Sequence, residues 1–129
     1  MADEITNVGK NFIRDVLKGD VTDGQIKYIA WGDDGTANPS PNTMTALGNE
    51  LGRHAVTGRS SGGIGVLQTI IYLAPEDAVE DIEEIGFFAG EDASSTPDSG
   101  VMVARFLYSK SKPETQSLQI VLQDTIDQA

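Results

Sequence analysis

Few side chains of this sequence have the chemistry of a catalytic group, and they do not form a set. His54 is the only histidine, and the chain has no cysteine. A single histidine without a second catalytic group beside it is more often structural than catalytic. Ser60 and Ser61 lie in a Gly-rich stretch, where we expect a flexible tip and no nucleophile elbow. The sequence therefore argues against an enzyme, and we assign no catalytic residue.

Two further patterns are only superficially similar to ligand sites. Gly62-Gly63-x-Gly65 has the glycines of a phosphate loop, but no lysine follows and no helix is expected there. Asp33 and Asp34 are the candidates for a cation, but the residues after them do not continue the alternating ligands of an EF-hand. We expect these aspartates to accept hydrogen bonds from backbone amides of a turn instead. The sequence predicts no metal and no cofactor.

A dense run of carboxylates lies in the second half of the chain. Such a run is usually a solvated face, since like charges this close are costly unless screened or paired. Binding of a cation or of a basic partner surface is the alternative. The run comprises Glu76, Asp77, Glu80, Asp81, Glu83 and Glu84.

The net charge of the chain limits the kinds of molecule that it is expected to bind. Nine basic residues against twenty acidic ones give a formal net charge of −11. A nucleic-acid binder needs a basic surface, because it gains free energy by releasing the counterions of the phosphates. We therefore expect neither nucleic acid nor an anionic membrane surface as a partner. The first ten residues lack a basic region followed by an apolar one, so we expect no signal peptide, and no apolar stretch approaches the ~18 residues of a spanning helix.

Helical spacing of apolar residues predicts one helix near the start of the chain. The pattern covers residues 5–18. Asp3 or Thr6 is the expected N-cap and Gly19 the expected stop. Gly9 is unfavourable inside such a helix.

The remainder of the chain alternates apolar and polar residues in strand-like runs. No helical segment connects these runs, so antiparallel pairing is expected. The prediction is one domain over 1–129, a mainly β (α+β) fold with a helix in 1–19 and an antiparallel β-sandwich of five to six strands in 25–126. Residues 45–51 are expected to form one or two helical turns. The strand-like runs are 26–31, 54–57, 65–73, 81–88, 101–108 and 118–126.

Two adjacent aromatic residues suggest an interface. Phe87 and Phe88 cannot both point to the same side of a strand. One of them must be exposed or covered by a neighbour, which we interpret as modest evidence for a subunit interface. Gly86 before them predicts a bulge or a close backbone approach.

Five elements follow one another in a specific order. The segment from Ile26 to Arg53 is the most informative, because a strand stops at a Gly-Asp-Asp-Gly turn and a Pro-containing segment leads into a Glu-x-x-Arg ending. In this order the chain resembles the N-terminal attachment (tail-collar) domain of tail fibre proteins of P2- and Mu-like tailed bacteriophages. The elements are Ile5–Lys10, Ile29–Gly35 followed by Pro39 and Pro41, Thr45–Arg53, Ile82–Phe88 and Val101–Arg105.

The resemblance implies a non-enzymatic structural protein of a tailed virus, associated with the tail, baseplate or collar as an adaptor or fibre-attachment protein. It implies other virion proteins as partners, a homo-oligomer that is a trimer, and location in the virion after synthesis in the host cytoplasm. Fibres of this family continue into a shaft and a receptor-binding tip, whereas this chain ends at Ala129. A capsid decoration protein on the head surface is one alternative, and a carbohydrate- or cation-binding module is another.

Within this resemblance, several residues acquire structural roles. Glu50 and Arg53 are three apart and are expected to pair on a helical turn. Either could brace the Gly32–Gly35 turn, and Glu84 is a further candidate partner for Arg53. The residues expected to be structural or to form an interface are Gly32, Gly35, Glu50, Arg53, Glu84, Gly86, Phe87 and Phe88.

Overall fold

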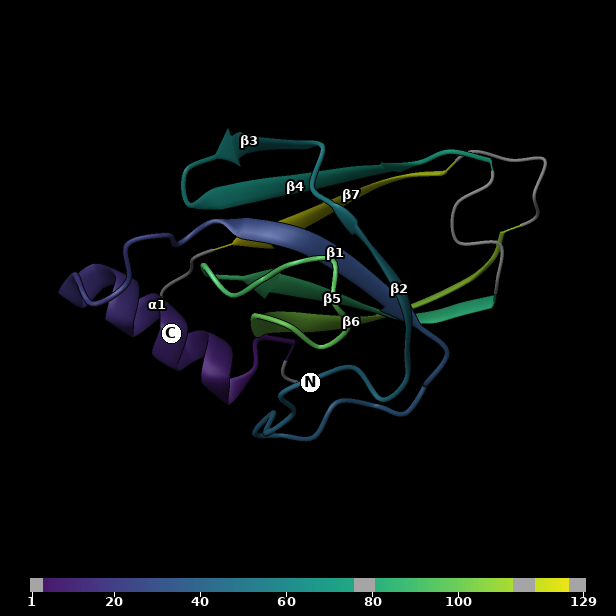
Figure 1. Ribbon diagram of the computed structural model, residues 1–129, viewed down its shortest axis with the longest axis horizontal. Coiled ribbons are helices and arrows are strands. Elements are labelled where there is room, and N and C mark those ends of the chain that lie inside the picture. Colours follow the sequence, from purple (N-terminus) through teal and green to yellow (C-terminus); the bar gives the residue numbers. More distant parts are fainter. Residues whose placement is uncertain (1–3, 76–80, 113–117, 126–129) are drawn as a thin grey trace.

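The protein is a β-sandwich with one helix at its N-terminal end (Figure 1). The computed structural model describes residues 4–75, 81–112 and 118–125, the last range mainly through its backbone. Two antiparallel sheets have the strand orders β2-β1-β5-β6 and β3-β4-β7. The elements are α1 (Asn7–Lys18), β1 (Ile26–Gly32), β2 (Glu50–Ala55), β3 (Gly58–Gly63), β4 (Val66–Leu73), β5 (Asp81–Ala89), β6 (Val101–Ser111) and β7 (Leu118–Thr125).

The predicted mainly β architecture with an N-terminal helix is confirmed, whereas the predicted helical turns at 45–51 are wrong. Residues 45–49 form bends, and Glu50 begins strand β2. Backbone amides in this segment bind a buried side chain of β5 rather than carbonyls of a helix, as described below. In the described part of the chain, two short strands, β2 and β3, occupy the stretch between 50 and 63.

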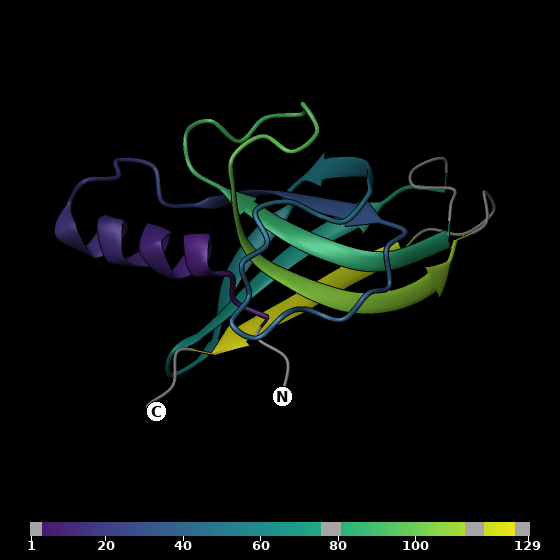
Figure 2. The same ribbon diagram turned by 90° about the horizontal axis from the view of Figure 1, so that it is seen from below.

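Helix α1 begins and ends where its caps are expected. The Thr6 hydroxyl accepts a hydrogen bond from the Gly9 amide at 2.9 Å, and Gly19 ends the helix in the left-handed region at φ 86°. Gly9 has a packing role, since a Cβ there would lie 2.8 Å from Val103 Cα. Its missing side chain allows α1 to lie directly against β6. Figure 2 shows α1 beside one end of the sandwich.

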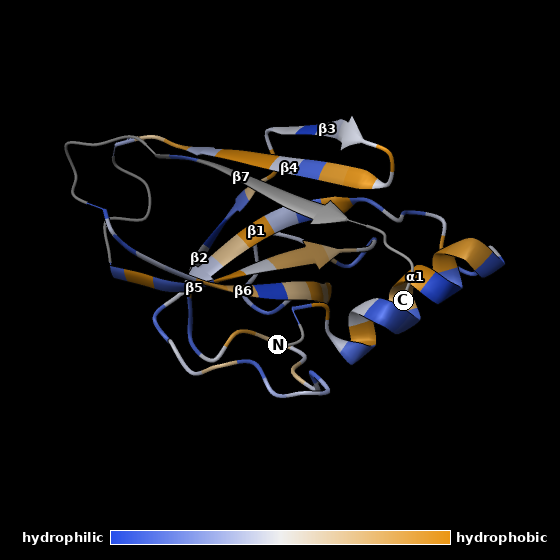
Figure 3. Ribbon diagram, turned by 180° about the vertical axis from the view of Figure 1, so that it is seen from behind, coloured by the Kyte–Doolittle hydropathy of each residue, from blue (hydrophilic) through white to orange (hydrophobic). Residues whose placement is uncertain are grey.

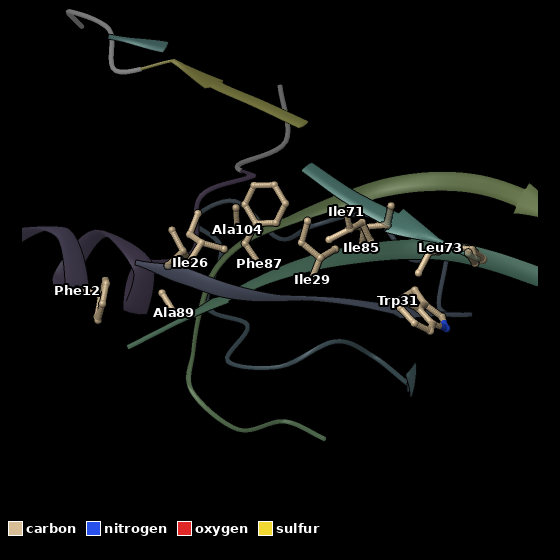
Figure 4. Close-up of a cluster of buried hydrophobic side chains, with 12 residues drawn as sticks. Phe12, Ile26, Ile29, Trp31, Ile71, Leu73, Ile85, Phe87, Ala89 and Ala104 are labelled. Carbon is tan, nitrogen blue, oxygen red and sulfur yellow. The ribbon is translucent and has the colours of Figure 1, made fainter. Parts of the chain in front are cut away.

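The main core lies between the two sheets. Ile29 and Phe87 of the four-stranded sheet are fully buried, as is Ile71 of the other sheet (Figure 4). Phe87 packs against Phe106 with ring centroids 5.3 Å apart. From Ile29 in β1 and from Ile85 in β5 onward, every second side chain lies in this core, as expected for strands that form one wall of a sandwich. Register shifts near the start of each strand interrupt this alternation.

The opposite face of the four-stranded sheet, here called the outer face, is buried as well. Phe88 and Met102 have no exposed surface, and Leu47 from the segment 33–49 packs onto them. Ala93 from the segment after β5 completes this second cluster. The exposed aromatic that suggested a subunit interface is therefore absent, because segments of the same chain cover Phe88.

Candidate functional site

A fully buried ion pair lies on the outer face. Glu84 of β5 and Arg105 of β6 have no exposed side-chain surface, and Arg105 Nε lies 2.8 Å from Glu84 Oε1. Arg105 pairs in register with Gly86, two residues beyond Glu84, so the two charged residues are diagonal neighbours on one face. A buried pair of this kind is tolerated only if further hydrogen bonds satisfy both groups.

The Glu84 carboxylate receives three such hydrogen bonds from backbone amides. Oε1 accepts from Gly48 N at 2.9 Å, and Oε2 accepts from Asn49 N at 2.9 Å and from Asp34 N at 3.1 Å. Gly32 is required beside it, because a Cβ at this position would collide with Glu84 Oε2 and with the Asn49 carbonyl. One carboxylate thus binds both ends of the segment 33–49 to the sheet.

The Arg105 guanidinium holds the early part of the same segment. Nη2 donates to the Asp34 carbonyl at 2.8 Å, and Nη1 donates to the Thr36 carbonyl at 2.8 Å and to Asn38 Oδ1 at 2.7 Å. Asn38 Nδ2 in turn donates to the Arg105 carbonyl at 2.9 Å. The turn after β1 is therefore braced by Glu84 and Arg105, and not by Glu50 or Arg53 as the sequence suggested.

A second buried ion pair lies on the edge strand β2. Arg53 Nε and Nη2 each donate to one Glu50 oxygen at 2.7 Å, and both side chains are 2% exposed. The predicted contact is present, but it forms on a strand and not on a helical turn. The register shifts so that Trp31 pairs with Gly52 and Gly32 with Glu50. The extra residue makes a bulge that brings positions three apart to one face.

The second pair fixes the loop between β5 and β6. Arg53 Nη1 donates to the Ser94 and Ser99 carbonyls at 3.1 and 3.0 Å, and Glu50 Oε1 accepts from Asp98 N at 3.1 Å. The guanidinium also lies over the Phe88 ring, 4.3 Å from its centroid. Arg53 thus connects the loop to the cluster beneath it, and its predicted pairing with Glu84 is wrong.

Two predicted glycines have different roles from those expected. Gly86 lies in a regular part of the β1–β5 pairing, and a Cβ there would lie 2.9 Å from Leu47 Cδ2. It admits a side chain of the segment 33–49 rather than a neighbouring backbone, and the register shift occurs one step later, between Phe87 and Phe88. Gly35 is exposed, and a Cβ there would meet only Glu83, at 3.7 Å or more.

Asp33 and Asp34 stabilise a turn. Asp34 Oδ1 accepts from Thr36 N at 2.9 Å, and Asp33 Oδ1 accepts from Asn49 Nδ2 at 2.7 Å. Hydrogen bonds from the side chain and the amide of Thr36 lower the pKa of the Asp34 carboxyl from its ordinary value. Among the described residues, no group of three or more His, Cys, Asp or Glu side chains is placed to hold a metal ion.

The acidic run does not form one surface in the described ranges. Glu84 is buried, while Asp81 accepts from Ser111 Oγ at 2.7 Å and Glu83 from Ser109 Oγ at 3.2 Å on the exposed side. Its other members, Glu76, Asp77 and Glu80, lie outside the described residues.

The residues with nucleophile or base chemistry are engaged elsewhere. Gly58 to Gly62 does have the spacing Gly-x-Ser-x-Gly, but it lies within strand β3 and not at a strand-to-helix turn. Ser60 Oγ donates to Gln68 Oε1 at 2.8 Å, and His54 Nδ1 lies 2.7 Å from the carbonyl of the adjacent Ala55. These contacts do not join the histidine to the serine.

Arg105 is a site residue that the sequence patterns did not single out. The signal was an arginine in the apolar run Val-Met-Val-Ala-Arg-Phe, which predicts a buried charge and hence a buried partner.

Comparison of the chain with protein-family models and with curated proteins found no match. In the part of the chain that the structure describes, no helix is long and apolar enough to cross a membrane.

Proposed function

We propose that the protein is a non-enzymatic structural protein of a tailed virus, an adaptor or fibre-attachment protein associated with the tail, baseplate or collar. It would assemble as a homo-oligomer, a trimer in this proposal, and bind other virion proteins. This proposal depends on the resemblance of its five sequence elements to tail-fibre attachment domains.

One structural observation supports the proposal: the elements that carry the resemblance contact one another. The turn after Gly32, the Gly48–Arg53 stretch, Glu84 and Arg105 meet on the outer face through the two buried ion pairs. The opening element joins the same sheet, where Thr6 N donates to the Val103 carbonyl at 3.0 Å. These contacts join the segments named in the resemblance into one structural unit, as the signature of a shared fold requires.

The arrangement also fits a docking role in physical terms. Two long connections, 33–49 and 90–100, have no helix or strand, yet charge-assisted hydrogen bonds fix them to the sheet. Loops held in one conformation lose little conformational entropy when a partner binds. Such loops are suited to the permanent contacts of a particle.

Labelled particles provide the test. Antibody or gold labelling of purified virions, read by electron microscopy, is expected to place the protein at the tail, baseplate or collar. Label over the head would favour the alternative of a capsid decoration protein. Absence from purified particles, together with binding on a glycan array or a melting temperature raised by calcium, would favour the carbohydrate- or cation-binding module.

A further inference from the structure

The turn between β3 and β4 presents apolar side chains to solvent. Ile64 lies in this turn and is fully exposed, with a relative exposure of 102%. Leu67 is 38% exposed, and Val66 is half-buried. Figure 3 shows the apolar colour at this turn and at the start of β4. We call Ile64, Val66 and Leu67 the apolar tip.

The backbone of the turn does not require an apolar residue at position 64. Gly65 supplies the left-handed conformation of the turn, with φ at 69°. The residue before it needs only an ordinary φ, and turns usually place polar residues or proline at such positions. Because Ile64 is fully exposed, its side chain adds nothing to the core. The fold therefore does not account for an isoleucine here.

Glycines leave the apolar tip unshielded. A Cβ at Gly63 would meet nothing within 4 Å, so the space beside Ile64 is open on that side. Gly62 has no side chain, and Val66 lies over it, since a Cβ at Gly62 would lie 2.8 Å from Val66 Cγ1. Ile64 is thus a convex knob at the end of a hairpin, and its complement is a concave site.

The apolar tip belongs to the largest acid-free part of the chain. Residues 54–75 contain no Asp or Glu and one basic residue, Arg59, although the chain has twenty acidic residues. Arg59 Nε and Nη2 donate to the Ile26 carbonyl at 3.0 and 2.6 Å, so this guanidinium is held at β1. A neutral apolar knob gains free energy by burial in a neutral apolar site, whereas a charged site would lose its hydration for nothing in return.

Two other occupants fit the apolar tip less well. The hollow beside α1 is lined by five carboxylates, so a second copy of the chain does not offer a neutral pocket there. A lipid bilayer is disfavoured by the net charge of −11, and residues 62–67 include no basic or aromatic side chain to contact headgroups. A pocket on a different protein matches the knob in shape, polarity and charge.

We infer that the β3–β4 hairpin inserts Ile64 into a neutral, apolar pocket of a different protein. Val66 and Leu67 contact the rim of that pocket. Within the proposed function, the partner is a neighbouring protein of the virion. The inference rests on the proposed function for the identity of the partner, and not for the contact itself.

Incorporation into particles tests the inference within the proposed function. The amount of each variant in purified particles is measured by quantitative mass spectrometry relative to the capsid protein. Ile64→Asp is expected to lower incorporation at least about tenfold, because it places a charge in the apolar pocket. Ile64→Val keeps most of the apolar contact and should be incorporated normally.

The matched control is Leu17→Asp, which makes the same kind of change at a residue of α1 that is 83% exposed. It should leave incorporation unchanged. Ile64→Asp is expected to keep the wild-type melting temperature, because Ile64 is fully exposed and takes no part in the core. A loss of incorporation at unchanged stability therefore reports on the contact and not on folding.

Photo-cross-linking in the producing cell tests the contact without relying on particles. A photoreactive amino acid replaces Ile64 in one variant and Leu17 in another. At position 64 we expect one product with a different protein, joined at residues that line an apolar pocket. At position 17 we expect no such product.

Several results would overturn the inference. They are normal incorporation of Ile64→Asp, cross-links from position 64 only to a second copy, and the absence of any cross-link there. Ile64-dependent sedimentation with vesicles of phosphatidylcholine and phosphatidylglycerol would replace the pocket by a bilayer.

Failure of the proposed function gives a different pattern. If the wild-type chain is absent from particles, the virion role is removed. The inference then stands if position 64 cross-links to an apolar pocket of another protein, and falls if it does not. If the wild-type chain is present and Ile64→Asp is incorporated equally, the virion role stands and the inference falls.

Discussion

Glu84 and Arg105 have no exposed side-chain surface, and together they bind both ends of the segment 33–49 to the outer face. The segment contains no helix or strand, and its other anchors are the buried Leu47 and the Asn42 carbonyl, which accepts a hydrogen bond from Asn7 N at 2.8 Å. The ion pair therefore acts as an attachment point of a loop, and its strength follows from the complete set of hydrogen bonds around it.

Removing either partner should be strongly destabilising. Glu84→Ala leaves the Arg105 charge buried without its partner, and Arg105→Ala does the same to Glu84. We expect each to lower the free energy of unfolding by about 3–5 kcal/mol in urea or thermal melts. Arg14→Ala, which breaks the exposed pair with Asp15, should change it by less than about 1 kcal/mol. Equal effects at the two places would contradict the role of burial.

Arg53→Ala should loosen the loop between β5 and β6 and either destabilise the protein or prevent its assembly. The change leaves Glu50 buried without a partner and removes donors to the Ser94 and Ser99 carbonyls. A loss of about 3 kcal/mol in stability is expected. Hydrogen exchange should also accelerate at residues 94–99. Arg53→Lys keeps the charge but cannot form both contacts to Glu50, so an intermediate loss is expected.

A wild-type melting temperature in Arg53→Ala, together with normal incorporation into particles, would refute this prediction. Faster exchange confined to residues 94–99 with normal stability would show that the pair orders the loop without supporting the sheet. The melting temperature and the hydrogen exchange together therefore distinguish a local effect on the loop from a global effect on stability.

Local signals explain why part of the fold could be predicted from sequence. The cap at Thr6 and the stop at Gly19 depend on neighbouring residues only, and both are as expected. Apolar and polar residues alternate along the strands because one face of each sheet packs against the core. By contrast, the bulge that unites Glu50 with Arg53 depends on pairing register between β1 and β2, which local spacing does not contain.

The buried outer face was not predictable for a related reason. Irregular segments cover it, and their positions follow from single long-range contacts such as Glu84 to Gly48 and Asn49. Apolar periodicity identifies faces covered by helices or sheets, but it does not report a face that loops cover. In the sequence, the pair Phe87–Phe88 therefore suggests an interface, whereas in the structure both side chains lie in cores of the same chain.

Phe88→Ala tests whether the outer face is a core. Phe88 is fully buried in the cluster with Leu47 and Met102, so truncation should cost about 3–5 kcal/mol, as in the interior of a protein. Tyr72→Ala is the control, because Tyr72 is 48% exposed on β4 and should cost much less. Similar small losses for both, in a monomeric sample, would indicate that the loops cover this face only weakly.

Gly9→Ala tests whether the steric cost of a Cβ at this position outweighs the gain in helix propensity. Alanine favours a helix over glycine by about 1 kcal/mol, which alone predicts a more stable protein. A Cβ at Gly9, however, would lie 2.8 Å from Val103 Cα, so α1 must move away from β6. We expect a net loss of about 1–3 kcal/mol from this overpacking, measured by thermal melting. Asn11→Ala, at an exposed position of α1, is the control and should be neutral or slightly stabilising. If Gly9→Ala stabilised the protein as much as propensity predicts, the close contact between α1 and β6 would not exist in solution.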